Sequence, residues 1–239
     1  NAGKESVVIE PNDPRGRGLI LKLVAKADIW MENLAPGTLD AMGLSYAELS
    51  AVNPEIIYAS CSGFGRKSNY GKKRALDAVA HPPSRIMHLT RYADLPVKIG
   101  FSAVDLAAAV GLVGAVLGAL RTREATGSGM YVDLAMADIG VWMTQKAWPQ
   151  VSAGGGTPSR LGNRSATACP HNLFVVKDGF VAIAIDTDQQ WMKFTQLVRD
   201  NDLINDRTLA TVEGRLRNVE RIEKKIEGWL AGRSAAEVV

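Results

Sequence analysis

The stretch KIGFSAVDLAAAVGLVGAVLGALRTREATGSGMYVDLAMAD, residues 98–138, decides the fold of this chain. Every residue from Leu106 to Leu120 is apolar or glycine, which predicts a helix that is buried on all sides. This run is shorter than the roughly 20 apolar residues needed to cross a bilayer, and a charge stands at its head, so we expect no membrane span. Three glycines recur at helical spacing, where we expect a close neighbour: Gly111, Gly114 and Gly118.

Asp105, at the head of this run, has two interpretations. Most aspartates at the start of a helix are N-caps that accept hydrogen bonds from backbone N–H groups. Alternatively, a carboxylate held between the glycine-containing segment Lys98–Phe101 and a buried helix is a fixed nucleophile or base in a partly dry site. The residue type alone favours the cap, and both interpretations stay open at this point.

The composition is that of an ordinary globular protein. The chain has 239 residues, of which 46% are hydrophobic and 22% charged, and its net charge is +3. So small a surplus of positive charge, without a basic run interleaved with aromatics, argues against a nucleic-acid-binding groove. The chain has no signal peptide pattern, lacks an initiator Met and begins inside what reads as a folded unit, so we expect its N-terminus to be incomplete.

Cysteine and histidine usage argues against disulfides and metal sites. Cys61 and Cys169 are the only cysteines and form no CxxC pair, which favours free thiols and a reducing, cytoplasmic setting. The histidines, His81, His88 and His171, lack the close Cys, His or Glu neighbours of a zinc site. We therefore predict no metal.

Strand and helix patterns alternate over the first part of the chain. We expect a strand at Val7–Ile9, a helix that begins at Asp13-Pro14, and strands at Ile29–Met31 and Ile56–Gly65. This order favours a parallel sheet, and the turn Ala35–Gly37 lies at a strand's carboxyl end, where such sheets bind ligands.

Two features of the following loop bear on function. The SGFG at Ser62–Gly65 lacks the GxGxxG spacing of a dinucleotide fingerprint, which excludes a nicotinamide-dependent dehydrogenase. The basic run Arg66–Arg74 is either a solvated loop or a clamp for phosphate groups.

The pattern changes after the first 150 residues. Pro149–Ser165 is rich in Gly, Pro and Ser, and it is followed by a predicted hairpin with its turn at Lys177–Gly179 and by two amphipathic helical patterns. We therefore predict a large domain at 1–150, and a linker with a small α+β domain at 151–239.

Four stretches, taken together and in order, resemble the class III CoA-transferases, the CaiB/BaiF family that includes formyl-CoA and carnitine CoA-transferases. They are NAGKESVVIE (1–10), ADIWMENLAPGTLDAMGLSYAELSAVNPEIIYASCSGFG (27–65), the Asp105 segment through TREATGSGMYVDLAMAD (98–138), and RLGN (160–163) followed by LFVVKDGFVAIAI (173–185). No single stretch is decisive, but the ordered set covers most of the chain and is specific.

The resemblance implies an α/β fold: a Rossmann-like large, CoA-binding domain with a parallel sheet, here apparently without its first unit, and a smaller α+β domain. It also implies an interlocked homodimer. The family's catalytic aspartate matches Asp105, which would attack the thioester of an acyl-CoA and form a mixed anhydride before a carboxylic acid acceptor takes the CoA. CoA is then a substrate, with no tightly bound cofactor. The acyl donor and acceptor stay open.

The resemblance further matches nine residues to positions along the CoA: Ile9, Asn12, Asn33, Leu34, Ala35, Met42, Arg74, Asp77 and Met136. Leu34 replaces the usual aromatic residue. For both methionines core packing is an equally good interpretation.

Two alternatives to a transferase remain. Related α-methylacyl-CoA racemases carry a catalytic His where this chain has Leu76, and leucine cannot move a proton, which argues against a racemase. A catalytically degenerate CoA-binding paralogue is suggested by Leu34, by Leu76 and by the paired prolines in HPPSR at 81–85.

Overall fold

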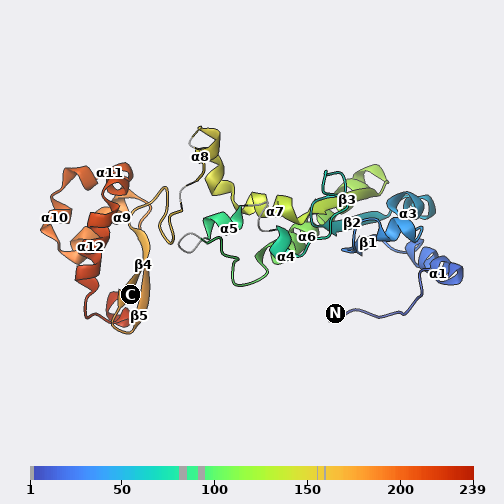
Figure 1. Ribbon diagram of the computed structural model, residues 1–239, viewed down its shortest axis with the longest axis horizontal. Helices are drawn as coiled ribbons and strands as arrows, with labels where there is room; N and C mark the ends of the chain where they lie inside the picture. Colours follow the sequence, from blue (N-terminus) through green and yellow to red (C-terminus); the bar gives the residue numbers. More distant parts are fainter. Residues whose placement is uncertain (1–2, 81–84, 91–94, 155, 159) are drawn as a thin grey trace. The chain divides into compact units, whose positions relative to one another are not determined.

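The computed structural model describes residues 3–80, 85–90, 95–154, 156–158 and 160–239. It divides into two compact units, Asn1–Pro158 and Ser159–Val239, which Figure 1 colours from blue to yellow and from yellow to red. Residues 81–84, which include His81 and the paired prolines of HPPSR, lie outside the described residues, so the structure does not test the expectation based on those prolines.

The first unit contains the elements α1 Pro14–Val24, β1 Ile29–Glu32, α2 Thr38–Ala41, α3 Tyr46–Val52, β2 Ile57–Ser62, α4 Asp77–Ala80, α5 Ile86–Leu89, α6 Ala103–Thr126, β3 Met130–Ala135, α7 Met136–Met143, η1 Gln145–Ala147 and α8 Trp148–Ser152. The second contains β4 His171–Val176, β5 Gly179–Ala184, α9 Asp188–Val198, α10 Asn201–Ile204, η2 Arg207–Leu209, α11 Val212–Arg217, α12 Val219–Leu230 and α13 Ala235–Val238.

The first unit is built on a parallel sheet with the order β1-β2-β3. The middle strand, β2, pairs through Ile57 with Ile29 of β1 and with Met130 of β3. Its apolar run is buried because strands cover both edges and helices cover its faces. The predicted parallel sheet is confirmed, with the strands expected at Ile29–Met31 and Ile56–Gly65 present as β1 and β2, and Figure 1 shows β1, β2 and β3 side by side.

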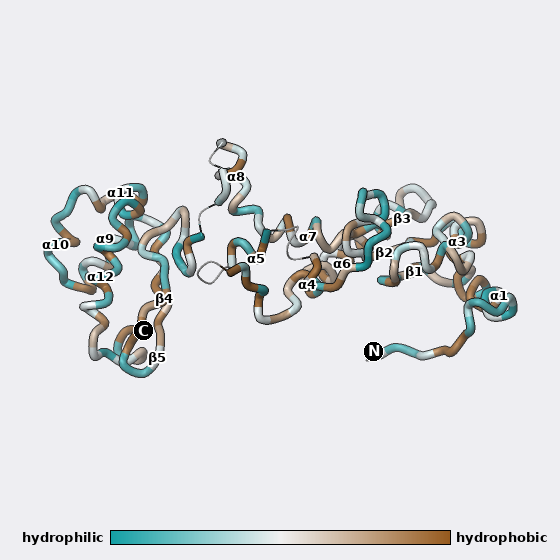
Figure 2. The backbone as a smooth tube through the Cα atoms, in the orientation of Figure 1, coloured by the Kyte–Doolittle hydropathy of each residue, from teal (hydrophilic) through white to brown (hydrophobic). Residues whose placement is uncertain are grey.

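The strand predicted at Val7–Ile9 was wrong. This segment is the brown stretch that leads into α1 in Figure 2, and it has no regular structure. Val7 and Val8 are exposed, and no strand of the described sheet pairs with them. The chain instead turns directly into α1, where a Cβ on Gly16 would lie 1.9 Å from the Glu10 carbonyl oxygen. An apolar run forms a strand only where a neighbour accepts its backbone hydrogen bonds.

Helix α1 begins where the sequence predicts, and polar side chains cap both α1 and α3. The carboxylate of Asp13 accepts a hydrogen bond from the backbone N–H of Arg15 and caps α1, with Pro14 at the first helical position. Ser45 and Glu48 form a capping box at α3.

The prediction that the central helix is buried on all sides was wrong for this chain. One face of α6, which includes Val104, Ala108, Leu112 and Val116, packs in the core beside the sheet. The opposite face is exposed and apolar, and we call these four residues the α6 stripe: Leu106, Val110, Val113 and Leu117.

The predicted glycine contacts of α6 are only partly found. A Cβ on Gly111 would lie 3.1 Å from the side chain of Ile139 in α7, so a neighbour does pack closely there. A Cβ on Gly114 or Gly118 would meet no atom within 4 Å, because both lie on the exposed side of the helix.

By length and hydropathy α6 is also the one helix among the described residues that could cross a membrane. A third of its apolar window is buried inside the protein. A single helix of this kind is weak evidence for a membrane span, since helices from protein cores pass the same test.

The second unit is a hairpin covered by helices. β4 and β5 form the predicted antiparallel hairpin, in which His171 lies opposite Ala184. The core includes Phe174, Ile222 and Ile226. The buried Arg215 of α11 donates from Nε to the Cys169 carbonyl at 2.8 Å, and so ties the helices to the start of the hairpin. A buried guanidinium is tolerated because backbone carbonyls accept its hydrogen bonds and Asp188 pairs with it at 2.9 Å.

Candidate functional site

A cleft of about 1260 Å³ opens at the carboxyl ends of β1 and β2 in the first unit. This is the edge at which open α/β sheets bind ligands. Its walls come from the segment after β1, the loop after β2, the stretch before and within α4, one side of α6 and the start of α7. The lining residues are Lys4, Met31, Glu32, Asn33, Leu34, Ala35, Pro36, Cys61, Ser62, Gly63, Arg74, Ala75, Leu76, Val79, Asp105, Ala108, Ala109, Leu112, Val113 and Met136.

Asp105 lies in the first turn of α6 and lines this cleft, with an exposed side chain. It is the third residue of the helix, and Ser102 occupies the N-cap position. The interpretation of Asp105 as the N-cap was therefore wrong. The carboxylate instead stands where a molecule in the cleft can meet it.

Asn33, Leu34 and Ala35 line the cleft directly after β1. Glu32, whose residue is only 8% exposed, holds this segment, because its carboxylate accepts a hydrogen bond from the backbone N–H of Leu34 at 2.8 Å. The same carboxylate accepts a hydrogen bond from the Ser60 hydroxyl of β2.

Arg66 completes this network from the loop after β2. Its guanidinium lies 3.3 Å from Glu32 and 2.9 Å from Asp40, and its backbone N–H donates to Asp133 of β3 at 3.0 Å. These bonds fix the loop and the Asn33–Ala35 segment relative to each other. Arg66 is therefore engaged in the fold and not available as the phosphate clamp considered for the basic run.

Cys61 lines the cleft on β2, near Asp105. Burial raises the pKa of the Cys61 thiol, and the negative charge of Asp105 raises this pKa further. The thiol is therefore protonated and weakly nucleophilic at neutral pH, whereas a carboxylate is ionised there.

Six of the ten predicted site residues line this one cleft: Asn33, Leu34, Ala35, Arg74, Asp105 and Met136. Met136 is buried, and it belongs to the core cluster under α6 as well as to the cleft wall. Leu76, the residue that stands in the racemases' histidine position, is 77% exposed and also lines the cleft.

The other four lie elsewhere. Ile9 and Asn12 precede α1, where the Asn12 side chain donates to Glu10 at 3.0 Å. Met42 packs in the cluster of α1, α3 and β2. Asp77 is buried at the start of α4 and accepts hydrogen bonds from the backbone of α6. Contacts of these four residues with CoA stay predictions.

Two charged residues that support the site, Glu32 and Lys98, are not among the residues predicted from the sequence. Glu32 lies in the apolar strand Ile29–Glu32, and a carboxylate at the buried end of such a strand is a signal that could have found it. Lys98 forms an ion pair with Asp77, 3.3 Å apart. Nothing in the local pattern indicates that pair.

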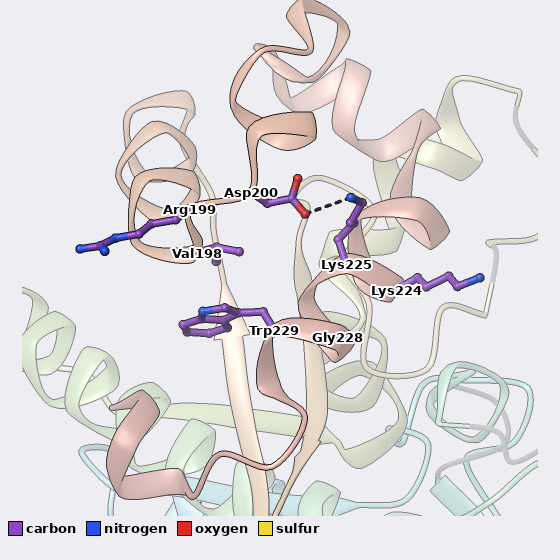
Figure 3. Close-up of a pocket in the computed structure, with 7 residues that line it drawn as sticks. All are labelled: Val198, Arg199, Asp200, Lys224, Lys225, Gly228 and Trp229. Atoms are coloured by element: carbon purple, nitrogen blue, oxygen red, sulfur yellow. Dashed lines mark ion pairs between the residues drawn. The ribbon is translucent and has the colours of Figure 1, made fainter.

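A smaller pocket of about 340 Å³ lies in the second unit, over Trp229. In Figure 3, Lys225 points toward Asp200, while Arg199 and Lys224 point away from each other. Lys225 pairs with Asp200 at 3.0 Å and with Asp202 at 2.6 Å. The pocket contains none of the predicted site residues, and the charge of Lys225 is already paired with two carboxylates.

Over the described part of the chain, no three His, Cys, Asp or Glu side chains gather into a group that could hold a metal ion. His88 belongs to α5 and His171 to β4. Both cysteines are free.

Comparison with known proteins gives one consistent result. A model of CoA-transferase family III matches residues 1–239. The chain is 32% identical to an acetyl-CoA:oxalate CoA-transferase of Acetobacter aceti over 99% of its own length, and 33% identical to a succinyl-CoA:mesaconate CoA-transferase of Haloarcula hispanica over 97%. A crystal structure of a CaiB/BaiF family protein from Brucella suis superposes with a TM-score of 0.82, at 32% identity and over 99% of this chain.

The chain is shorter than these proteins. It covers 61% of the Acetobacter protein, 59% of the Haloarcula protein and 63% of the Brucella chain.

Proposed function

The chain belongs to CoA-transferase family III, and from that membership we propose that it moves CoA from an acyl-CoA to a carboxylic acid, with Asp105 as the nucleophile. One observation carries the proposal. The exposed Asp105 lines a cleft of about 1260 Å³, which exceeds the roughly 300–1,000 Å³ of typical small-ligand pockets. A carboxylate in that position is accessible to a thioester.

The proposed chemistry uses the Asp105 carboxylate twice. It attacks the thioester carbonyl, the C–S bond breaks, and CoA leaves as a thiolate while Asp105 carries the acyl group as a mixed anhydride. The thiolate then attacks the Asp105 carbonyl, which releases the donor acid and leaves CoA as a thioester on Asp105. The acceptor carboxylate then attacks the Asp105 thioester, which forms a second mixed anhydride and releases the CoA thiolate. This thiolate attacks the acyl carbonyl of the acceptor, so that the new acyl-CoA leaves and the Asp105 carboxylate is free again. Covalent catalysis of this kind divides one difficult exchange into easier steps.

The cleft offers partners for the rest of the CoA molecule. Arg74 supplies a cation for phosphate groups, and the Asn33–Ala35 segment supplies backbone and amide groups held in place by Glu32. Leu112 and Met136 supply an apolar wall for the pantetheine arm. CoA binds here as a substrate, and no tightly bound cofactor takes part.

The two compact units correspond in this proposal to a CoA-binding large domain and a small α+β domain. Two free thiols support a reducing, cytoplasmic setting. The relatives named above act on oxalate and mesaconate, so short carboxylic acids are the acceptors to test first.

A homodimer, interlocked as the family resemblance implies, is also part of the proposal. The α6 stripe exposes four apolar side chains in a row at helical spacing, of which Val110 is 75% exposed. Contiguous apolar patches of this kind mark interaction surfaces. A second copy of the chain would remove the stripe from water.

Intact-mass spectrometry after mixing with acetyl-CoA or succinyl-CoA tests the proposal. We expect wild-type protein to gain a covalent acyl or CoA adduct and Asp105→Asn to gain none, because an amide does not attack a thioester. Wild-type protein that binds CoA without any adduct would indicate the degenerate paralogue. A racemase would instead exchange the α-proton of the acyl group with solvent, and the exposed Leu76 in the cleft provides no base for that exchange.

A further inference from the structure

The start of α6 is capped by a residue from outside the helix. Ser102 stands at the N-cap position, but its side chain makes no capping hydrogen bond. Instead, one carboxylate oxygen of Asp77 in α4 accepts hydrogen bonds from the backbone N–H groups of Val104 at 3.0 Å and Asp105 at 3.2 Å. An N-cap side chain normally accepts from these same two positions.

The other oxygen of Asp77 lies 3.3 Å from Nζ of Lys98. That ammonium group also donates to the backbone carbonyls of Ile99 at 3.0 Å and Phe101 at 3.1 Å. Lys98 thus joins the Asp77 carboxylate to the segment that enters α6. Asp77 is only 5% exposed, and a buried carboxylate is stable there because a cation and two N–H groups surround it.

This arrangement bears directly on Asp105. An aspartate in the first turn of a helix tends to turn its carboxylate back onto nearby backbone N–H groups. Here Asp77 already occupies the N–H groups of Val104 and of Asp105 itself. Asp77 therefore fixes the backbone of Asp105 through this hydrogen bond, while the side chain of Asp105 lines the cleft.

We propose that Asp77 is a positioning residue for the nucleophile: with Lys98 it caps α6 in place of Ser102 and fixes the direction in which Asp105 faces the thioester. This role rests on the proposed function, and it differs from the contact with CoA that the family resemblance implies for Asp77. Asp77 does not line the cleft in the described structure.

Three variants test the role. Asp77→Asn keeps an acceptor oxygen for the two N–H groups and loses the charge that pairs with Lys98, Asp77→Ala loses both, and Lys98→Met loses only the cation. Misplacing a reacting group by about 1 Å can cost on the order of 100-fold in rate. We expect kcat to fall roughly 10- to 100-fold in Asp77→Ala and less in the other two, with KM for the acyl-CoA within about twofold of wild type.

Amide hydrogen exchange at Val104 and Asp105 gives a second readout that does not depend on activity. Exchange should be faster in Asp77→Ala and close to wild type in Asp77→Asn. Ser45→Ala is the matched control, because it removes the cap of α3 in the same unit and should leave kcat unchanged. Circular dichroism verifies that each variant folds. If Asp77→Ala does not fold, the two single variants Asp77→Asn and Lys98→Met test the role.

The possible outcomes separate the two proposals. A wild-type kcat in Asp77→Ala, or a raised KM with an unchanged kcat, would overturn the positioning role and leave the transferase proposal intact. Unchanged exchange at Val104 and Asp105 would overturn the cap. A wild-type protein that forms no adduct with either acyl-CoA contradicts the transferase proposal, and the positioning role falls with it.

Discussion

The charge of Asp105 acts on its neighbour Cys61. Burial is the main cause of the raised pKa of Cys61, and the Asp105 carboxylate is the next. Because a thiol with a raised pKa forms less thiolate at a given pH, Cys61 reacts slowly with alkylating reagents until the solution is distinctly alkaline. The pair thus reports on the state of the proposed nucleophile without any substrate.

We predict that Asp105→Asn lowers the pKa of Cys61. Removing a neighbouring negative charge favours the thiolate, so the pH at which iodoacetamide labels Cys61 at half its maximal rate should move down. Peptide mass spectrometry across about pH 7 to 11 measures this rate for both cysteines in the same sample.

Cys169 is the internal control for that titration. Burial, followed by the charge of Glu223, raises its pKa to about 11. Its labelling profile should be identical in wild type and Asp105→Asn. A Cys61 profile that does not move would show that Asp105 carries no charge near the thiol.

Gly63 sets how closely the loop after β2 approaches the other wall of the cleft. A Cβ on this residue would lie 2.1 Å from the Cβ of Ala75, between Arg74 and Leu76. Only glycine permits this approach, so the 74–76 segment depends on it for its position.

We predict that Gly63→Ala weakens binding of acyl-CoA, because the added methyl displaces the segment that carries Arg74. Overpacking of this kind costs about 1–3 kcal/mol, and where this cost falls on binding KM should rise by about 5- to 150-fold, measured by steady-state kinetics. Gly18→Ala in α1, where an added Cβ meets nothing within 4 Å, should leave KM unchanged. An unchanged KM in Gly63→Ala would contradict the assignment of this wall to CoA.

Strands can be predicted well from the sequence where an apolar run is short and has turn residues at both ends. β2 and the β4–β5 hairpin lie where expected, because turn residues bound each run. The prediction fails at Val7–Ile9, because this apolar run has no strand to pair with. It also fails for α6, because the composition of a helix shows how apolar it is but not which of its faces the rest of the chain covers. Distances in sequence explain what was missed in the site, since Glu32 and Arg66 or Asp77 and Lys98 meet only after folding.

At the scale of the whole molecule, the oligomeric state tests directly whether the α6 stripe is the contact between two copies of the chain. We predict that wild-type protein sediments as a dimer and that Leu117→Glu sediments as a monomer, because burying a carboxylate in an apolar contact costs several kcal/mol. Leu23→Glu in α1 is the matched control. Leu23 and Leu117 are 54% and 60% exposed, yet only Leu117 belongs to the stripe.

Two results of analytical ultracentrifugation would contradict this prediction. A wild-type monomer would mean that the stripe has another partner, and a Leu117→Glu dimer would place the contact between copies elsewhere on the protein.

The order of the strands also bears on how the protein is made. β2 lies between β1, which precedes it, and β3, which follows it by a long connection through α6. Once the ribosome has released the chain as far as Gly100, β1 and β2 of the described sheet are present, but β3 and α6 are not. One face of β1 and β2 therefore stays uncovered until α6 emerges, and chaperones or proteases meet it in that interval.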